Sequence, residues 1–400
     1  MSQTRLQRFW MGLVLGVLSA FAPLSLDMYL PALPSLTADF HTIPSMAQLS
    51  LTFCLLGLAA GQLFIGPISD SLGRRKPLII GLVVYTLVSF ACTFTSSIWV
   101  LLIFRLFQGL AGAAGIVSAR AIVRDYYSGT ELTRFFAFLM LINGAAPIIA
   151  PILGGQLLRI TNWHGIFIVL GVIGVLLIVA VLIGLPESLP AEKRLTGGVA
   201  KTFLVMAGLF KDRIFMGYSL SQGFVMAAMF GYIAGSPFVI QDLYQVSAQW
   251  FSIIFATNGL GIIIASQISA RLSIHFGEKK TFISGLLLAG ISSLVLFVFI
   301  LINAQLIWIL IPLFLVVSSV GIVTTIGSSL AMQEQGRNAG GASAVIGVSQ
   351  LMLGALSSPL VGLGGSKTAV PMGIVIVGFS VSSLLYYLLS RSNQKNISVN

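Results

Sequence analysis

The sequence predicts an all-helical integral membrane protein with twelve spanning segments in two halves of six. Three observations support this expectation: 57% of the 400 residues are hydrophobic, only 8% are charged, and the mean hydropathy is +1.00. Soluble domains carry about 25% charged residues, so a soluble enzyme is excluded. A spanning helix takes about 20 apolar residues, and with its loop about 30 to 35, so the length allows on the order of twelve spans.

Charge-free apolar runs place the spans in chain order. The uncharged stretch 281–333 is too long for one span, so the polar break at Asn303 and Gln305 predicts a hairpin. The predicted spans cover residues 9–31, 46–68, 77–95, 98–119, 134–158, 165–185, 214–236, 249–270, 281–302, 306–328, 339–364 and 369–390.

The longest hydrophilic segment, 186–213, divides the predicted spans into an N-terminal bundle, 1–185, and a C-terminal bundle, 214–400, with a short tail. The two bundles share weak sequence similarities, and the matching residues are separated by nearly the same number of positions. The matching residues are Gly73 with Gly277, Pro151 with Pro359 and Gly154 with Gly362. Parallel repeats of this kind are typical of transporters that rock about a central site.

The basic residues fall in alternate loops. When both termini are assigned to the cytoplasm, most Lys and Arg lie on the cytoplasmic side and only Arg159 and Lys367 lie on the other. This is a positive-inside bias. The net charge of +11 therefore reports orientation, and no nucleic-acid partner is needed to explain it.

A charged loop, 66–77, follows the second predicted span. Its glycines permit close helix approach and a tight turn, while its acid and basic cluster can form ion pairs that hold a gate in one state. A loop that merely orients the spans is the alternative. The residues assigned to the gate are Gly66, Asp70, Gly73, Arg74 and Arg75.

Arg105 is the one cation inside a predicted span, 98–119. A guanidinium in a membrane costs several kcal/mol unless it is paired or hydrated, so its presence predicts a function. A purely structural ion pair is the alternative. Gln108 and Gly112 share its helix face, and Gly109 lies beside them. This stripe can face a polar interior while Gly112 allows tight packing.

Asp27 is the only acid clearly placed in a span, 9–31. Asp27 and Arg105 are both expected in the outer half of the membrane, where they can meet at one depth. A conformational cycle that changes their proximity takes up and releases a proton. In the alternative interpretation Asp27 is simply hydrated at the membrane interface, because Pro31 lies only four residues away.

The fifth predicted span, 134–158, combines paired prolines with small residues, namely Pro147, Pro151, Gly154 and Gly155. Such residues bend a span and let a neighbour approach. The seventh span carries flexible thioethers and aromatics on one face, which suit a surface that adapts to varied ligands, although packing or lipid contact explains them too. The residues proposed to bind substrate are Phe21, Tyr29, Asn143, Tyr218, Gln222, Met226 and Met229.

No cluster of Cys, His, Asp and Glu has metal-ligand spacing, and no phosphate-binding loop of the Walker type occurs in the sequence. We therefore expect no cofactor and no metal, and an ion gradient as the energy source. Cys54 and Cys92 lie in apolar runs, which favours small buried side chains over a disulfide.

Five stretches of the sequence resemble motifs of one known family. The loop 66–77 resembles the hallmark loop of the major facilitator superfamily, and the run 105–113 resembles the proton-transfer motif of its antiporters. The run 150–155 is similar to the motif of its exporters, with Ala150 where many members have glycine. The stretches 25–34 and 119–129 resemble signatures of the bicyclomycin-resistance and chloramphenicol-resistance branch of twelve-helix drug:proton antiporters.

The resemblance implies the major facilitator fold and a proton-coupled antiporter that exports small drug-like compounds across the bacterial cytoplasmic membrane by alternating access. In this interpretation Asp27 accepts the proton, Arg105 tunes or relays it, and the Asp70 loop stabilises the outward-open state. The partners are a small-molecule substrate, protons and the lipid bilayer, with no obligate protein partner. The alternatives are a metabolite or amino-acid exporter or importer on the same fold, and a non-transporting membrane receptor or scaffold.

Overall fold

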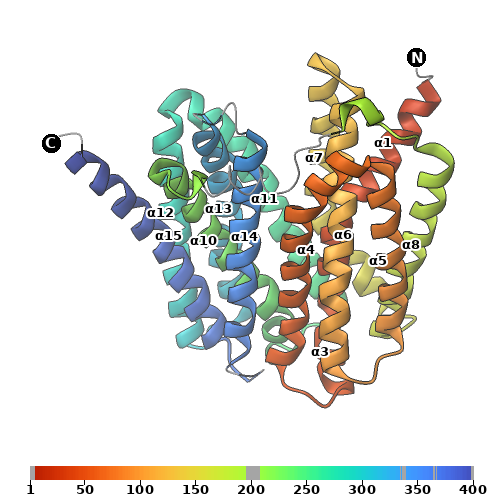
Figure 1. Cartoon of the computed structure of the whole chain (residues 1–400). Coiled ribbons are helices and arrows are strands. Elements are labelled where there is room, and N and C mark those ends of the chain that lie inside the picture. The colour runs from red at the N-terminus through yellow and green to blue at the C-terminus, as the bar shows by residue number, and fades with distance from the viewer. Residues whose placement is uncertain are drawn as a thin grey trace. The chain divides into compact units, whose positions relative to one another are not determined.

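The computed structural model describes residues 5–194, 208–333, 335, 339–363, 365 and 367–397 (Figure 1). Over these residues the regular structure is entirely helical, as predicted. The helices are α1 (Arg5–Ser19), α2 (Phe21–Asp27), η1 (Leu30–Ala32), α3 (Leu33–Asp39), α4 (Pro44–Leu72), α5 (Arg75–Thr93), α6 (Ile98–Tyr126), α7 (Gly129–Leu157), α8 (Trp163–Gly184), η2 (Ala191–Lys193), α10 (Arg213–Ser236), η3 (Pro237–Leu243), α11 (Ala248–Phe276), α12 (Glu278–Leu301), α13 (Leu306–Met332), α14 (Ala339–Gly362) and α15 (Val370–Ile397).

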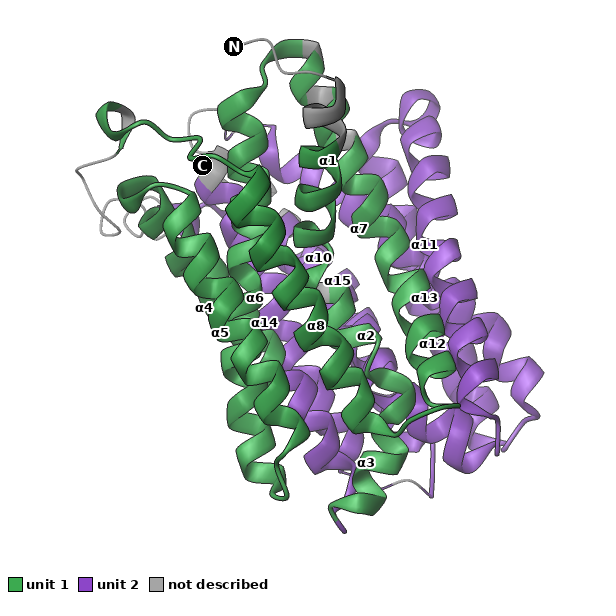
Figure 2. Cartoon of the chain, turned by 90° about the vertical axis from the view of Figure 1, so that its right-hand side faces the viewer, with its two compact units in different colours: residues 1–40, 53–201 green, residues 41–52, 202–400 purple. Residues whose placement is uncertain are grey.

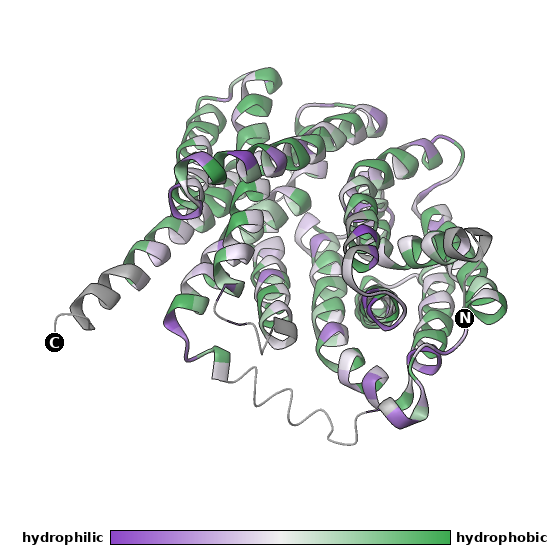
Figure 3. Ribbon diagram, turned by 90° about the horizontal axis from the view of Figure 1, so that it is seen from above, coloured by the Kyte–Doolittle hydropathy of each residue, from purple (hydrophilic) through white to green (hydrophobic). Residues whose placement is uncertain are grey.

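The helices have the length and the apolar surface of membrane spans. Eleven of the described helices are long and apolar enough to cross a bilayer, and the bent pair Trp10–Ser19 and Pro23–Asp39 brings the total to twelve if it forms one span. Large apolar side chains point outward, among them Ile183, which is 80% exposed. Figure 3 shows the helices mostly in the hydrophobic colour. The prediction of an all-helical, multi-pass protein is confirmed.

The first span differs from the predicted range 9–31. The chain bends by 49° between Trp10–Ser19 and Pro23–Asp39, before Asp27. A separate break in the α-helix follows Asp27, and the α-helix restarts at Leu33. Pro31 lies in the first turn of η1 and Pro34 in the first turn of α3. Each proline lacks a backbone N–H donor, which is tolerated in a first turn but interrupts a continuous helix. The prediction that this span ends at Pro31 was therefore wrong.

Other helices continue past the predicted ends, because the apolar-run criterion stops at the first charged residue. α6 continues past 119 to Tyr126, and α11 continues past 270 to Phe276. After α10, the chain continues through Pro237–Leu243 as a π-helix instead of ending at 236. A charged residue ends a run of hydropathy but not a run of backbone hydrogen bonds.

The described chain forms two compact units, coloured separately in Figure 2. The first unit holds residues 1–40 and 53–201, and the second holds 41–52 and 202–400. The first turns of α4 thus group with the second unit, where Gln48 Nε2 donates to the carbonyl of Ala234 at 2.9 Å. The predicted boundary between the bundles was placed at the hydrophilic segment 186–213, whereas the two units are defined by which residues pack together in space.

Both units contain a helix crossing that only glycine permits. In the first unit, a Cβ on Gly57 of α4 would collide with the carbonyl of Leu106, and a Cβ on Gly109 of α6 would collide with the carbonyl of Cys54. In the second unit, Gly321 of α13 lies in the same way against a backbone carbonyl of α11. Small residues let membrane helices approach this closely. Inside the first unit, α5 packs beside both α6 and α8 (Figure 1).

Candidate functional site

Arg105 lies fully buried on α6, inside the first unit. Its Nη1 donates to Gln108 Oε1 at 2.5 Å, and Gln108 Nε2 donates to Ser89 Oγ at 2.8 Å. Ser89 Oγ in turn donates to the carbonyl of Tyr85 at 2.7 Å. This relay ties the guanidinium to the backbone of α5. Among the described residues, the Nε and Nη2 atoms of Arg105 find no hydrogen-bond partner.

Two aromatic rings flank the Arg105 guanidinium. Its Cζ lies 5.0 Å from the ring centroid of Tyr29 and 5.7 Å from that of Phe167. The two ring centroids are 5.3 Å apart. A guanidinium within about 6 Å of a ring face is attracted by the quadrupole of the ring. Tyr29 lies in the break of the first span and Phe167 lies on α8, so two further elements contribute to this environment.

Asp27 is the last residue of α2 and its side chain is buried, at 7% exposure. Within the described part of the chain it makes no hydrogen bond, and no ion pair joins it to Arg105. The structure instead brings Tyr29, two residues further along, onto the guanidinium. The helical segment continues beyond Asp27 to Asp39.

The predicted proline and glycine motif lies on α7, next to the same break. Pro147 and Pro151 are both inside this helix. A Cβ on Gly154 would collide with the carbonyl of Met28, so the backbone of α7 touches the first span immediately after Asp27. Gly155 is buried beside it. The motif therefore supports the segment that carries Asp27.

Two residues proposed to bind substrate have other contacts in the first unit. Phe21 packs edge-on against Tyr85, with ring centroids 4.4 Å apart, and the Tyr85 hydroxyl shares a 2.8 Å hydrogen bond with Ser25 Oγ. Gly112 faces the Tyr85 ring, and a Cβ on Gly112 would lie 3.6 Å from that ring. Asn143 is half-buried, and its Nδ2 donates to the carbonyl one turn earlier in α7.

The predicted gate loop is held by Arg74, whose side chain is 4% exposed. Arg74 Nη1 donates to Asp70 Oδ1 at 2.5 Å and to Ser69 Oγ at 2.8 Å, and Nε donates to Asp125 Oδ2 at 3.0 Å. Burial opposes the charge of the guanidinium, but its hydrogen bonds to Asp125 and Asp70 raise the Arg74 pKa above the ordinary value. Gly73 adopts φ of 94°, a backbone conformation that favours glycine. A Cβ on Gly66 would lie 3.9 Å from the side chain of Val117, an ordinary contact, and the Nη2 of Arg75 donates to the carbonyl of Leu182 near the end of α8.

The sequence did not identify Glu187, which closes this loop from the segment after α8. Its carboxylate accepts hydrogen bonds from the backbone N–H groups of Arg74 at 2.8 Å, Arg75 at 3.1 Å and Leu189 at 3.0 Å. Burial raises the pKa of Glu187, but the hydrogen bonds from Leu189, Arg74 and Arg75 outweigh it and hold the pKa below 4.5. Ser188 Oγ donates to Asp125 at 2.8 Å. No local sequence pattern reveals these partners, because Arg74 and Glu187 lie far apart in the chain and meet only in the folded structure.

In the second unit, Gln222 is fully buried on α10. Its Oε1 accepts hydrogen bonds from Ser328 Oγ at 3.0 Å and Gln350 Nε2 at 3.2 Å, while its Nε2 has no partner. Tyr218, one turn earlier, packs against Phe282 with ring centroids 5.4 Å apart. The two methionines proposed on this face, Met226 and Met229, are half-buried.

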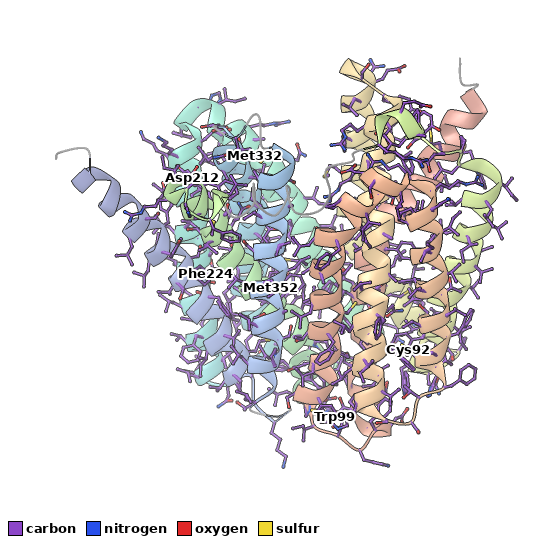
Figure 4. All side chains as sticks on the ribbon, in the orientation of Figure 1. Cys92, Trp99, Asp212, Phe224, Met332 and Met352 are labelled. Atoms are coloured by element: carbon purple, nitrogen blue, oxygen red, sulfur yellow. The ribbon has the colours of Figure 1, made fainter. Side chains whose placement is uncertain are left out.

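Metal chemistry finds no support in the described residues, where no group of three His, Cys, Asp or Glu side chains could hold an ion. Cys54 and Cys92 are both buried free thiols, as expected. Figure 4 marks Cys92 near the end of α5 and Trp99 at the start of α6, at the same end of the first unit.

Comparison with known proteins gives consistent matches over nearly the whole chain. Residues 15–359 match the family model described as Major Facilitator Superfamily. The chain is 42% identical over 388 residues to an uncharacterized MFS-type transporter of Bacillus subtilis, covering 96% of each chain. It is 29% identical over 391 residues to a bicyclomycin resistance protein homolog of Haemophilus influenzae, covering 96% of this chain and 97% of the relative.

A solved structure matches with the same completeness. The inward-facing, unoccupied structure of a bacterial homolog to the human lysosomal transporter Spinster superimposes with a TM-score of 0.77. The alignment covers 97% of this chain and 98% of the other at 14% identity. At that identity the similarity concerns the fold alone.

Proposed function

Because the chain belongs to the Major Facilitator Superfamily, we propose that this multi-pass transporter exports small drug-like molecules in exchange for protons. The observation that carries the proposal is the pair of ionisable groups in the membrane part of the first unit. Asp27 and Arg105 are both buried, and among the described residues two nitrogen atoms of Arg105 have no hydrogen-bond partner. Ionisable side chains inside spans are costly and mark ion pathways by default.

The proton step follows from elementary electrostatics. A carboxyl group in apolar surroundings binds a proton when no cation is near, and it releases the proton when a cation approaches. Asp27 supplies the carboxyl group and Arg105 the cation. A conformational change that alters their separation thus converts proton binding into a change of state, which is what an antiporter requires.

The membrane and the substrates follow from two supporting observations. The positive-inside distribution of Lys and Arg supports an orientation with both termini in the cytoplasm, in the bacterial cytoplasmic membrane. The name of the Haemophilus influenzae relative links a similar chain to antibiotic resistance, so antibiotics are the first substrates to test. The Asp70 loop, closed by Arg74, is the proposed gate on the cytoplasmic side.

Purified protein in liposomes tests the proposal. In the presence of a pH gradient, chloramphenicol added on one side of the membrane should enter the other compartment, and protons should leave that compartment in exchange. The Asp27→Asn variant should fold but show no proton release. Chloramphenicol uptake without proton movement would contradict antiport. Flux of alanine but not of the drug would favour a metabolite exporter, and binding of the drug without flux would favour a receptor.

A further inference from the structure

The guanidinium of Arg105 rests against aromatic rings where its expected carboxylate partner is absent. The Tyr29 ring, at 5.0 Å, and the Phe167 ring, at 5.7 Å, are the groups close to its Cζ. Gln108 occupies Nη1, and Nε and Nη2 remain without hydrogen bonds. In this conformation the π faces supply the attraction that a buried cation needs.

Tyr29 is also attached to the segment that carries the acid. It is the residue before η1, two positions after Asp27, within the break of the first span. The backbone between them, at Met28, is confined by Gly154 of α7. Asp27 and Tyr29 both follow the 49° bend between Ser19 and Pro23, so a movement at this bend changes the position of the Asp27 carboxyl group and of the Tyr29 ring together.

The other groups around Arg105 stay uncharged at physiological pH, so we assign the change of charge to Asp27. Among the described residues, the titratable side chains that interact with Arg105 include Cys54 of α4, Tyr85 and Cys92 of α5, and Tyr29 itself. Thiols and phenols are normally neutral at physiological pH. From η1 and α8, Arg105 is faced by the rings of Tyr29 and Phe167, and neither ring carries a charge.

We propose that Tyr29, with Phe167, is a positioning residue that competes with the Asp27 carboxylate for Arg105. This inference rests on the proposed proton coupling and deepens it. When Asp27 is protonated, the rings hold the guanidinium, as in this structure. When Asp27 loses its proton, the carboxylate takes the guanidinium from the rings, and the break in the first span moves with it. The aromatic pair thus sets how readily Asp27 keeps its proton.

The test compares Tyr29→Leu, which removes the ring, with Tyr29→Phe, which keeps it. In liposomes, the pH of half-maximal drug-driven proton release should move to lower pH by about 0.5 to 1.5 units in Tyr29→Leu, because Arg105 without its rings favours the ionised carboxyl group. Tyr29→Phe should keep the wild-type midpoint. Phe299→Leu, which removes a ring that packs on Trp308 in the second unit, is the matched control and should also keep it.

Phe167→Leu provides a second readout if Tyr29→Leu does not fold, and it should move the midpoint in the same direction. A wild-type midpoint in the folded ring-deleted variants would overturn the competition between ring and carboxylate. The proposed function fails separately, since it requires Asp27→Asn to lose proton release. If Asp27→Asn loses it while Tyr29→Leu keeps the normal midpoint, only the present inference is overturned.

Discussion

Gly154 of α7 lies against the backbone carbonyl of Met28, with no room for a Cβ between them. This contact joins the proline and glycine motif of α7 to the residue that follows Asp27. The glycine is required here by proximity rather than by its own backbone angles. The motif thus acts as a support for the break in the first span.

Gly154→Ala should consequently lower the free energy of unfolding by about 1 to 3 kcal/mol, the usual cost of overpacking, and should reduce transport. Thermal unfolding in detergent and initial transport rates provide the measurements. Gly290→Ala is the matched control, because Gly290 of α12 is buried but has open space where a Cβ would be. A Gly154→Ala protein with wild-type stability and wild-type transport would show that α7 adjusts freely at this point.

Arg105→Lys should lose about tenfold in the rate of coupled transport, equivalent to one charge-assisted hydrogen bond of about 1.5 kcal/mol. Lysine keeps the charge but lacks the planar fork that bonds Gln108 and leaves further N–H groups for a second acceptor in another state. Arg105→Ala should lose on the order of a hundredfold. Rates are measured in liposomes at equal protein content. Equal and full rates in both variants would assign Arg105 to packing.

Asp70→Asn should slow transport by about 5-fold to 100-fold, corresponding to a differential contribution of about 1 to 3 kcal/mol to one state. The amide loses the charged contact with Arg74, while Asp125 still holds that guanidinium. Topology should not change, since acids contribute little to the positive-inside rule. Substrate affinity and hydrogen exchange of the loop are measured alongside, with Ser71→Ala as the neighbouring control.

If Asp70→Asn transports at the wild-type rate and its loop exchanges hydrogen as in the wild type, the gate assignment fails. The loop would then only orient the spans, which is the alternative that the sequence left open. Slower transport with unchanged affinity is the expected combination, because a gate changes the population of states and not the contacts with substrate.

Glu187→Gln should lower the melting temperature by a few degrees at pH 7, because an amide accepts the backbone hydrogen bonds of Arg74 and Arg75 less strongly than a carboxylate does. The folded pKa of Glu187 lies below 4.5, so its contribution is fully present above that pH and is lost as the pH falls through the lowered value. The difference between variant and wild type should therefore shrink below about pH 4.5. Glu192→Gln, at an exposed acid nearby, is the control. A difference that persists unchanged in acid would mean that the charge of Glu187 is not involved.

Gln222→Met should keep the fold and shift substrate preference by about fivefold towards substrates with few hydrogen-bonding groups, the equivalent of one neutral hydrogen bond of about 1 kcal/mol. The methionine keeps the size of the side chain but removes the acceptor shared by Ser328 and Gln350. The ratio of kcat/KM for chloramphenicol and ethidium measures the preference. Ser219→Ala, which removes another buried polar group from α10, should leave that ratio unchanged.

Hydropathy and charge predicted most of the fold, because both properties are additive along the chain. The apolar runs located the spans, and the gate loop was found from Gly73 and the charges around it. The break after Asp27 was not predicted, since Pro31 signals an interruption equally well at the end of a span or within one that continues. Only contacts in space could decide between these.

The environment of the candidate site was less predictable for the same reason. Glu187 and Asp125 look like ordinary acids at the ends of helices, and nothing in their local sequence points to Arg74. Tyr29 was proposed to bind substrate, whereas the structure places its ring on Arg105. An ion pair between Asp27 and Arg105 was an inference from depth alone, and depth does not fix which side of a helix faces which neighbour.

The burial of both native thiols has a practical consequence for spectroscopy. Cys54 and Cys92 have no exposed surface, and Cys54 lies at the tight crossing of α4 and α6. Water-soluble maleimide and methanethiosulfonate reagents should leave them unmodified in the folded protein. The unaltered chain can then serve as its own background for spin labels or fluorophores at introduced surface cysteines. Distances between two spin labels can then be measured by electron paramagnetic resonance without replacing Cys54, so the crossing of α4 and α6 stays intact.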